Sequence, residues 1–116
     1  MSTSATAELI VNDIAYRWPE HPVVVVCVDG GDATYYESGL EDGILPNLKR
    51  FMSDGFSDIA DGVVPSFTNP NNLSIVTGAP PAVHGISGNF FLNPENGEAV
   101  MMNKPDYLRA ETLFAA

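Results

Sequence analysis

Apolar runs along the chain predict buried strands. Residues 23–28 form a continuous β-branched run with no polar alternation, which is typical of a strand buried on both faces of a parallel sheet. Asp29, Gly30, Gly31 and Asp32 follow it, and these residue types favour a sharp turn. A second strand is expected over residues 56–64. Two such strands are too few to complete a covered sheet, so we expect residues 1–116 to be the N-terminal, incomplete part of a single α/β domain.

Apolar residues at helical spacing predict three helices. One begins at Leu45-Pro46 and ends before Gly55, which is expected to provide a left-handed cap. A second follows Thr68, with Pro70 in its first turn, and ends at Gly78. A third is expected from Leu108 to the end of the chain. Each rests on the apolar face that residues three and four apart form on a helix.

The remaining segments are predicted as loops and short strands. Residues 82–89 form a glycine-rich loop, and two apolar stretches around Asn93-Pro94-Glu95-Asn96-Gly97 predict a hairpin. Residues 9–16 are expected to form a short strand or a leading edge. The single cysteine, Cys27, lies in the apolar run and is expected to pack there as a small hydrophobic residue.

Composition and charge restrict the classes of partner. The chain has 116 residues, 45% of them hydrophobic, and a formal net charge of −10, so it is predicted to be globular and not to bind nucleic acid or an anionic membrane through a basic surface. One cysteine permits no internal disulfide, and the N-terminal residues have neither the basic region nor the apolar core of a secretory signal. No segment approaches the roughly 20 apolar residues that a membrane span needs. These features predict a cytoplasmic protein, and they leave a homo-oligomer open.

Asp29 is the first candidate for chemistry. Ligands of open α/β sheets bind outside the carboxyl ends of the strands, and Asp29 lies at the end of the predicted strand 23–28. A buried carboxylate is costly unless it is paired or bound to a cation. Asp29 is therefore either an oxygen ligand to zinc or a similar divalent ion, or a turn-forming residue before two glycines.

Thr68 is the candidate nucleophile. A free hydroxyl is a weak nucleophile, but coordination to a divalent metal would activate it near neutral pH. Its expected place at the start of a helix adds the positive end of the macrodipole and backbone N–H groups that suit a phosphoryl oxygen. The alternative is an ordinary N-cap, because Thr-Asn-Pro is also a common way to begin a helix.

Three further residues were considered for the site. His84 lies in a turn-rich loop, where a histidine is expected to bind backbone groups in a structural role, although a ligand role is the alternative. His21 precedes the first predicted strand and so is placed at the opposite end from Asp29. Asn89 follows a glycine and has a side-chain amide that would suit a developing oxyanion, or it simply belongs to a turn.

The order of these motifs resembles one enzyme superfamily. Val28-Asp29-Gly30-Gly31-Asp32, Leu45-Pro46-Asn47-Leu48, the run Pro65 to Asn72, Ser74 to Gly78, and His84 to Asn89 resemble the alkaline phosphatase superfamily. The likeness is greatest to its nucleotide pyrophosphatase/phosphodiesterase-type branch, and within it to the carbon–phosphorus bond hydrolases that act on phosphonoacetate. It covers residues 23 to 116.

The resemblance implies a fold and a site. The fold would be an α/β/α sandwich with a mainly parallel sheet, and the enzyme would be a two-zinc hydrolase that splits phosphonoacetate into acetate and phosphate. Asp29 would bind one zinc, Thr68 would be the metal-bound nucleophile, and Asn89 would contact the phosphoryl oxygens. The family takes its other zinc ligands from positions beyond Ala116. Since zinc takes about four ligands, we expect the isolated chain to be inactive.

Two other functions remain open at this point. A related phosphodiesterase or nucleotide pyrophosphatase would share the same nucleophile motif and differ in substrate. A non-catalytic module would use the same loop to hold an anion without a metal. A chelator separates the latter from a zinc enzyme, because only the zinc enzyme would lose its activity and its affinity.

Overall fold

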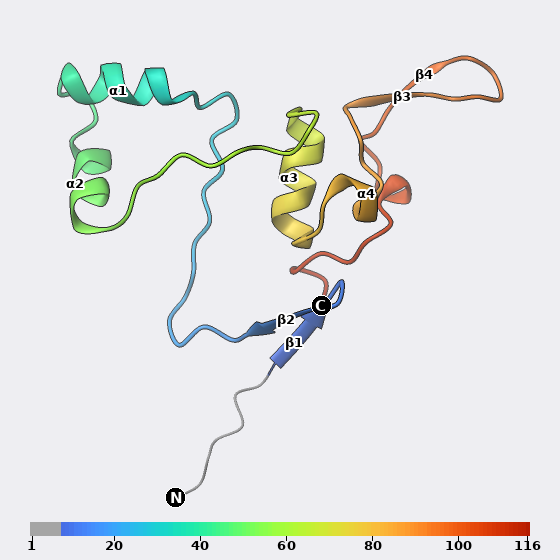
Figure 1. The fold of residues 1–116 in the computed structure, drawn as a ribbon, viewed down its shortest axis with the longest axis horizontal. Coiled ribbons are helices and arrows are strands. Elements are labelled where there is room, and N and C mark those ends of the chain that lie inside the picture. Colours follow the sequence, from blue (N-terminus) through green and yellow to red (C-terminus); the bar gives the residue numbers. More distant parts are fainter. Residues whose placement is uncertain (1–7) are drawn as a thin grey trace, which may run out of the picture. The chain divides into compact units, whose positions relative to one another are not determined.

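The computed structural model describes residues 8–116 as two compact units, which are treated separately below (Figure 1). The first unit contains the described residues up to Val25 together with Gly62–Ala116, and the second contains Val26–Asp61. The second unit is therefore an insertion between two parts of the first along the chain.

The first unit begins with a hairpin of two short strands. Strands β1 (Glu8–Val11) and β2 (Ile14–Arg17) pair in antiparallel register, with Val11 opposite Ile14. The two turn residues, Asn12 and Asp13, have φ of 48° and 64°, as a tight two-residue hairpin turn requires. Residues 9–16, expected to be one short strand or a leading edge, are thus two strands and their turn.

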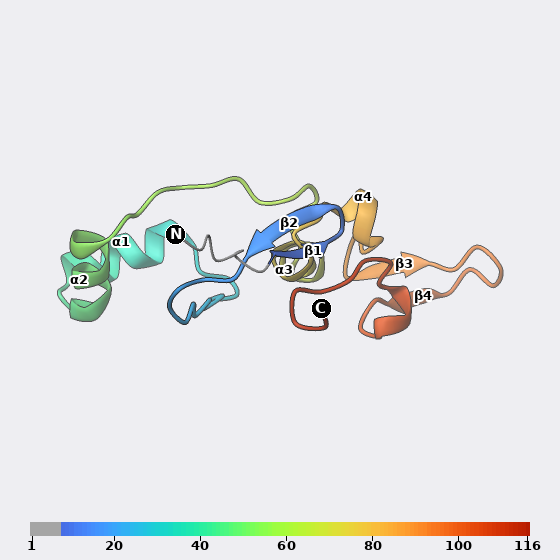
Figure 2. The same cartoon turned by 90° about the horizontal axis from the view of Figure 1, so that it is seen from below.

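Helix α3 (Thr68–Thr77) confirms the predicted helix after the Thr68 loop. It ends at Gly78, whose φ of 64° gives the left-handed cap that glycine accommodates best. A short helix, α4 (Pro81–His84), follows at once, so the first three residues of the predicted loop 82–89 are helical and the loop prediction is wrong there. Strand β2 lies beside the C-terminal end of α3 in both views (Figures 1 and 2), and a Cβ on Gly78 would clash with the Tyr16 hydroxyl oxygen.

The second hairpin is also confirmed. Strands β3 (Phe90–Leu92) and β4 (Ala99–Met101) pair in antiparallel register, and the 3₁₀ helix η1 (Pro105–Tyr107) follows them. The predicted helix over residues 108–116 is wrong. Its backbone donors bind elsewhere in the unit, because the Arg109 N–H donates to His84 O at 3.0 Å and the Leu113 N–H to Val76 O at 2.8 Å.

The core of this unit lies where the first hairpin meets α3 and the segment after it. Asn12 connects these parts, since its Nδ2 donates to Thr77 O at 2.8 Å and to Glu111 O at 2.9 Å. Its Oδ1 accepts a bond from the Glu111 N–H at 3.1 Å. The buried hydrophobic and polar residues of the core are Val11, Thr77, Ala79, His84 and Ile86.

The second unit contains two helices, α1 (Ala33–Glu41) and α2 (Pro46–Asp54). Helix α1 was not predicted. Asp32 caps it, because Asp32 Oδ1 accepts a bond from the Thr34 N–H at 2.8 Å. Helix α2 confirms the prediction from Leu45-Pro46, but Gly55 has φ of −123° and not the expected left-handed conformation. Its N–H still donates to Phe51 O.

The two strands predicted over residues 23–28 and 56–64 do not form within residues 8–116. A strand needs a neighbouring strand for its N–H and C=O groups, and in this part of the chain the only sheets are the two hairpins. The valines of the apolar run are 59% to 83% exposed, and Cys27 is exposed and not packed as predicted. The mixture of helices and strands remains that of an α/β fold.

Candidate active site

Thr68 is the first residue of α3. The N-cap position belongs to Phe67, which has no side-chain cap hydrogen bond, so the alternative of Thr68 as an ordinary N-cap is wrong. The Thr68 side chain is exposed. A hydroxyl on the first turn of a ten-residue helix lies in the positive field of the helix N-terminus, which favours a negative charge on or near its oxygen.

Asn89 lies next to this helix start. Its Oδ1 accepts a hydrogen bond at 3.1 Å from the N–H of Asn69, the residue after Thr68. Because Oδ1 accepts that bond, the N–H groups of the Asn89 amide are the ones suited to an anion. The structure therefore places the Asn89 side chain against the residue that follows Thr68, at the start of α3.

Asn69 completes a small ring of hydrogen bonds at this position. Its Nδ2 donates to Met102 O at 3.0 Å, and the Met102 N–H donates to Asn89 O at 2.8 Å. The sequence analysis missed Asn69, and no signal pointed to it beyond its place after the predicted nucleophile. It links α3 to the segment that follows β4.

Asp29 belongs to the second unit. The Gly31 N–H donates to Val28 O at 3.1 Å, so Asp29 and Gly30 are the central residues of a turn, and Gly30 has the positive φ of 69°. This geometry agrees with the turn-forming alternative and keeps the Asp29 side chain exposed. Its pairing with Thr68 at one metal ion stays a prediction.

His84 is fully buried and binds on both ring nitrogens. Nδ1 accepts from the Ile86 N–H at 3.1 Å, so the ring proton is on Nε2, which lies 3.0 Å from Ser74 Oγ. Burial lowers the pKa of His84 below its ordinary value of 6.5, and the carbonyl of Pro70 opposes this shift. The contacts join α3 to the segment after α4, as the structural alternative predicted.

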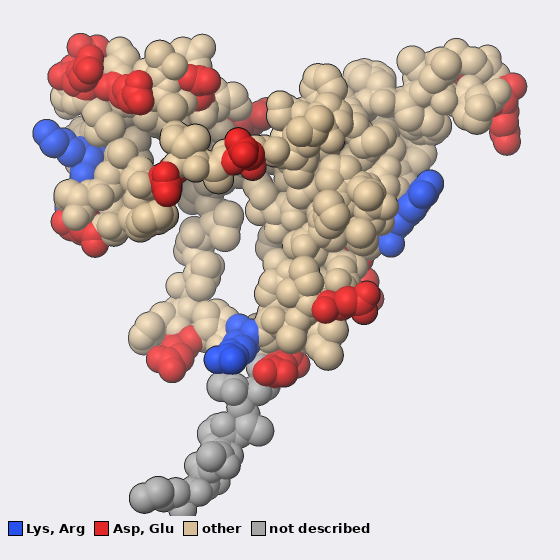
Figure 3. All heavy atoms as spheres, viewed as in Figure 1, with Lys and Arg blue, Asp and Glu red and all other residues tan. Residues whose placement is uncertain are grey.

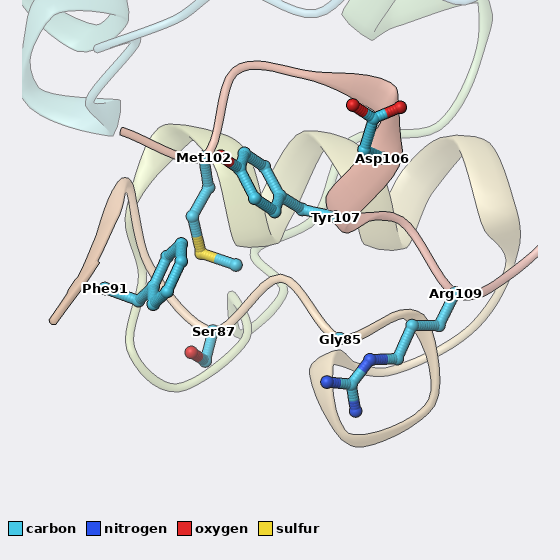
Figure 4. Close-up of a pocket in the computed structure, with 7 residues that line it drawn as sticks. All are labelled: Gly85, Ser87, Phe91, Met102, Asp106, Tyr107 and Arg109. Atoms are coloured by element: carbon cyan, nitrogen blue, oxygen red, sulfur yellow. The ribbon is translucent and has the colours of Figure 1, made fainter. Parts of the chain in front are cut away.

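A shallow pocket of about 310 Å³ lies beside the same segment (Figure 4). Phe91 and Tyr107 meet there edge to face, with ring centroids 5.5 Å apart. Arg109 lies along the backbone of Gly85, since a Cβ on Gly85 would be 2.9 Å from Arg109 Cδ. Asp106 also lines the pocket, so its charge opposes the use of this pocket by an anion.

Few basic side chains are available on the face shown in Figure 3 to attract an anionic ligand. The face of the molecule in Figure 3 has acidic groups over α1 and α2 and few basic groups. Within residues 8–116, no three His, Cys, Asp or Glu side chains are grouped as a metal site would require. No helix in this described part is long and apolar enough to cross a bilayer.

Comparison with known families identifies the chain. The model of the type I phosphodiesterase/nucleotide pyrophosphatase family matches residues 23–115. The chain belongs to this family. Among its relatives, an uncharacterised pyrophosphatase/phosphodiesterase of Schizosaccharomyces pombe is 33% identical over 87 residues, which is 72% of this chain and 17% of that protein. An ectonucleotide pyrophosphatase/phosphodiesterase of Caenorhabditis elegans is 33% identical over 102 residues, 82% of this chain and 13% of that protein.

Solved structures of phosphonoacetate hydrolase from Sinorhizobium meliloti 1021 are similar over nearly the whole chain. The complex with phosphonoformate is 49% identical, with a TM-score of 0.88, and covers 96% of this chain and 27% of that one. The complex with phosphonoacetate is 48% identical, with the same TM-score and coverage. These matches confirm the α/β fold class and the resemblance to the alkaline phosphatase superfamily. The chain spans about a quarter or less of the length of each protein.

Proposed function

We propose that the protein is a hydrolase that cleaves the carbon–phosphorus bond of phosphonoacetate, as part of a longer chain. The observation that carries this proposal is the hydrogen bond from the N–H of Asn69, the residue after Thr68, to Asn89 Oδ1 at the start of α3, in a chain 48% identical to a hydrolase solved with phosphonoacetate. Residues 1–116 would form the N-terminal part of a single catalytic domain. We also propose that the protein is cytoplasmic, that it binds neither nucleic acid nor a membrane, and that it can form a homo-oligomer.

Thr68, Asn89 and the N-terminus of α3 would each have one role in this reaction. Thr68 Oγ attacks phosphorus and loses its proton, and the bond from phosphorus to the methylene carbon breaks. That carbon takes a proton to give acetate, and water then releases phosphate from Thr68. The Asn89 amide N–H groups donate to the phosphoryl oxygens as charge builds on them. The field of the α3 N-terminus acts in the same direction.

A metal would add what these residues lack. Asp29 and Thr68 offer oxygen donors, which fit part of the ligand set of a divalent ion, and about two more ligands per zinc must come from elsewhere. Zinc, when bound, would stabilise the deprotonated form of the Thr68 hydroxyl near neutral pH. We propose two zinc ions for the complete site, with Asp29 and Thr68 at one of them.

The test is phosphate release from phosphonoacetate by the full-length protein and its Thr68→Ala variant. We expect the variant to lose turnover by at least about a thousandfold, because no other nucleophile replaces the hydroxyl, and to retain part of its zinc. Turnover close to that of the unmodified protein would rule out Thr68 as the nucleophile.

The family match supports a second function, a phosphodiesterase or nucleotide pyrophosphatase. An aryl phosphodiester and a nucleoside triphosphate assayed beside phosphonoacetate distinguish the two. Faster cleavage of either ester than of phosphonoacetate, judged by kcat/KM, would favour this second function. The roles of Thr68 and Asn89 would then be unchanged, since both reactions begin with attack on phosphorus.

A further inference from the structure

We propose that Asn69 is a positioning residue that fixes Thr68 and Asn89 relative to each other. This inference rests on the proposed function, because it assigns Asn69 a part in the same site. The geometry is a closed ring. The Asn69 N–H donates to Asn89 Oδ1, the Asn69 Nδ2 donates to Met102 O, and the Met102 N–H donates to Asn89 O.

The ring joins α3 to the two ends of the second hairpin. The backbone bond from the Met102 N–H to Asn89 O already connects those two ends, so the two Asn69 bonds are the ones that connect them to α3. Asn69 is in the first turn of α3, Asn89 precedes β3, and Met102 follows β4. The partners are separated by 20 and 33 positions in the sequence. Both Asn69 contacts are part-buried, where water competes less with a hydrogen bond than on an open surface.

The orientation of the Asn89 amide follows from this ring. With the Asn69 N–H on Oδ1, the carbonyl side of the amide faces α3 and the N–H groups are assigned to the substrate. Loss of the Asn69 side chain would remove the hydrogen bond to Met102 O. Met102 would then be held less firmly, and its N–H is the group that binds Asn89 O. Because a misplacement of about 1 Å can cost a hundredfold in rate, the consequence should appear in kcat.

The experiment compares three variants in the full-length protein. Asn69→Ala removes the side-chain donor, and Asn69→Asp keeps the size but places a carboxylate against the Met102 carbonyl oxygen. Asn96→Ala is the matched control, since Asn96 also donates through Nδ2, to Glu98 Oε2 at 3.0 Å, but does so at the exposed tip of the second hairpin. We expect both Asn69 variants to lower kcat about tenfold or more, with KM changed less than about threefold, and the control to match the unmodified protein.

A double-mutant cycle separates positioning from a general loss of stability. If Asn69 acts through Asn89, then Asn69→Ala should cost less than about threefold in kcat when added to Asn89→Ala. The full tenfold loss in that background would overturn the proposal. So would an unchanged kcat in both single Asn69 variants.

Hydrogen–deuterium exchange gives a readout that does not depend on activity. In Asn69→Ala we expect the amides of residues 69 and 102 to exchange about tenfold faster, while those of β1 and β2 keep their rates. Equal rates at residues 69 and 102 would show that the ring does not depend on this side chain, and would overturn the proposal. If the protein fails to cleave phosphonoacetate but the exchange changes as expected, the proposed function fails and the ring stands.

Discussion

Replacement of His84 by leucine should weaken the first unit in a pH-dependent way. The imidazole is fully buried, and its Nδ1 is the acceptor for the Ile86 N–H, in a residue that is only 3% exposed. Leucine has a similar volume and offers no acceptor. An unpaired buried N–H costs about 1–3 kcal/mol, and the lost contact with Ser74 Oγ about 1 kcal/mol more. The free energy of unfolding should therefore fall by about 2–4 kcal/mol near pH 7.5.

This difference should shrink as the pH falls. The pKa of His84 is lowered by burial from 6.5, so below pH 6.5 the unfolded chain binds a proton that the folded chain does not. The neutral His84 ring therefore contributes its full share of the unfolding free energy above about pH 6.5. This contribution is lost as the pH falls below 6.5 toward the lowered pKa of His84. The difference in unfolding free energy between the unmodified protein and His84→Leu should therefore be smaller at pH 5.5 than at pH 7.5.

The assay is urea unfolding of the full-length protein at both pH values, for the unmodified protein, His84→Leu and His21→Leu. His21 is the only other histidine and is exposed, so its replacement should change the unfolding free energy by less than about 0.5 kcal/mol at either pH. A loss below about 1 kcal/mol for His84→Leu at pH 7.5, or a loss that is equal at both pH values, would refute the reasoning.

Three further predictions follow from the same structure. Gly78→Ala should destabilise the protein by about 1–3 kcal/mol in thermal or urea unfolding, because Gly78 has a positive φ and the added Cβ would clash with the Tyr16 hydroxyl. Adding Tyr16→Phe to Gly78→Ala should recover part of that loss, and no recovery would exclude the clash. Asn12→Ala should cost about 2 kcal/mol or more, since two carbonyls and one N–H lose their partner; a cost below about 0.5 kcal/mol would contradict this role. A chelator should abolish phosphonoacetate cleavage and added zinc should restore it, whereas phosphate binding that persists unchanged in the chelator would favour an anion-binding protein.

Three elements were predicted from local signals, whereas α1 and the first hairpin were not, although their cap residue Asp32 and their turn residues Asn12 and Asp13 are local too. Helix α3 has Pro70 in its first turn and a glycine cap at Gly78, and the second hairpin has its own turn residues. The same holds for α2. In each case the residues that decide the conformation lie within the element or next to it, so the pattern was sufficient.

The predictions that failed depended on partners distant in the sequence. The run 23–28 is a strand only if another strand pairs with it, and no such partner lies within residues 8–116. The segment after Leu108 has helical spacing, but the N–H groups of Arg109 and Leu113 bind carbonyls of α4 and α3. A pattern of apolar residues does not contain this information.

The residues of the candidate site were also predicted only where the signal was local. The structural role of His84 was predicted from its turn-rich surroundings and is confirmed by its contacts. The roles of Thr68 and Asn89 stay predictions. Asn69 was missed because its importance comes from Met102, 33 positions away. The joint role of Asp29 and Thr68 at a metal stays a prediction, since they belong to different units.

The contact of Asn12 with Glu111 constrains the order of events during synthesis. These residues are 99 positions apart, and the 36 residues of the second unit lie between them. At about 5–20 residues per second, a ribosome needs about 5–20 s to go from one to the other. For that time the first hairpin exists without Glu111, one of the two residues that Asn12 binds. The second unit, whose helices form from neighbouring residues, can fold earlier than the unit into which it is inserted.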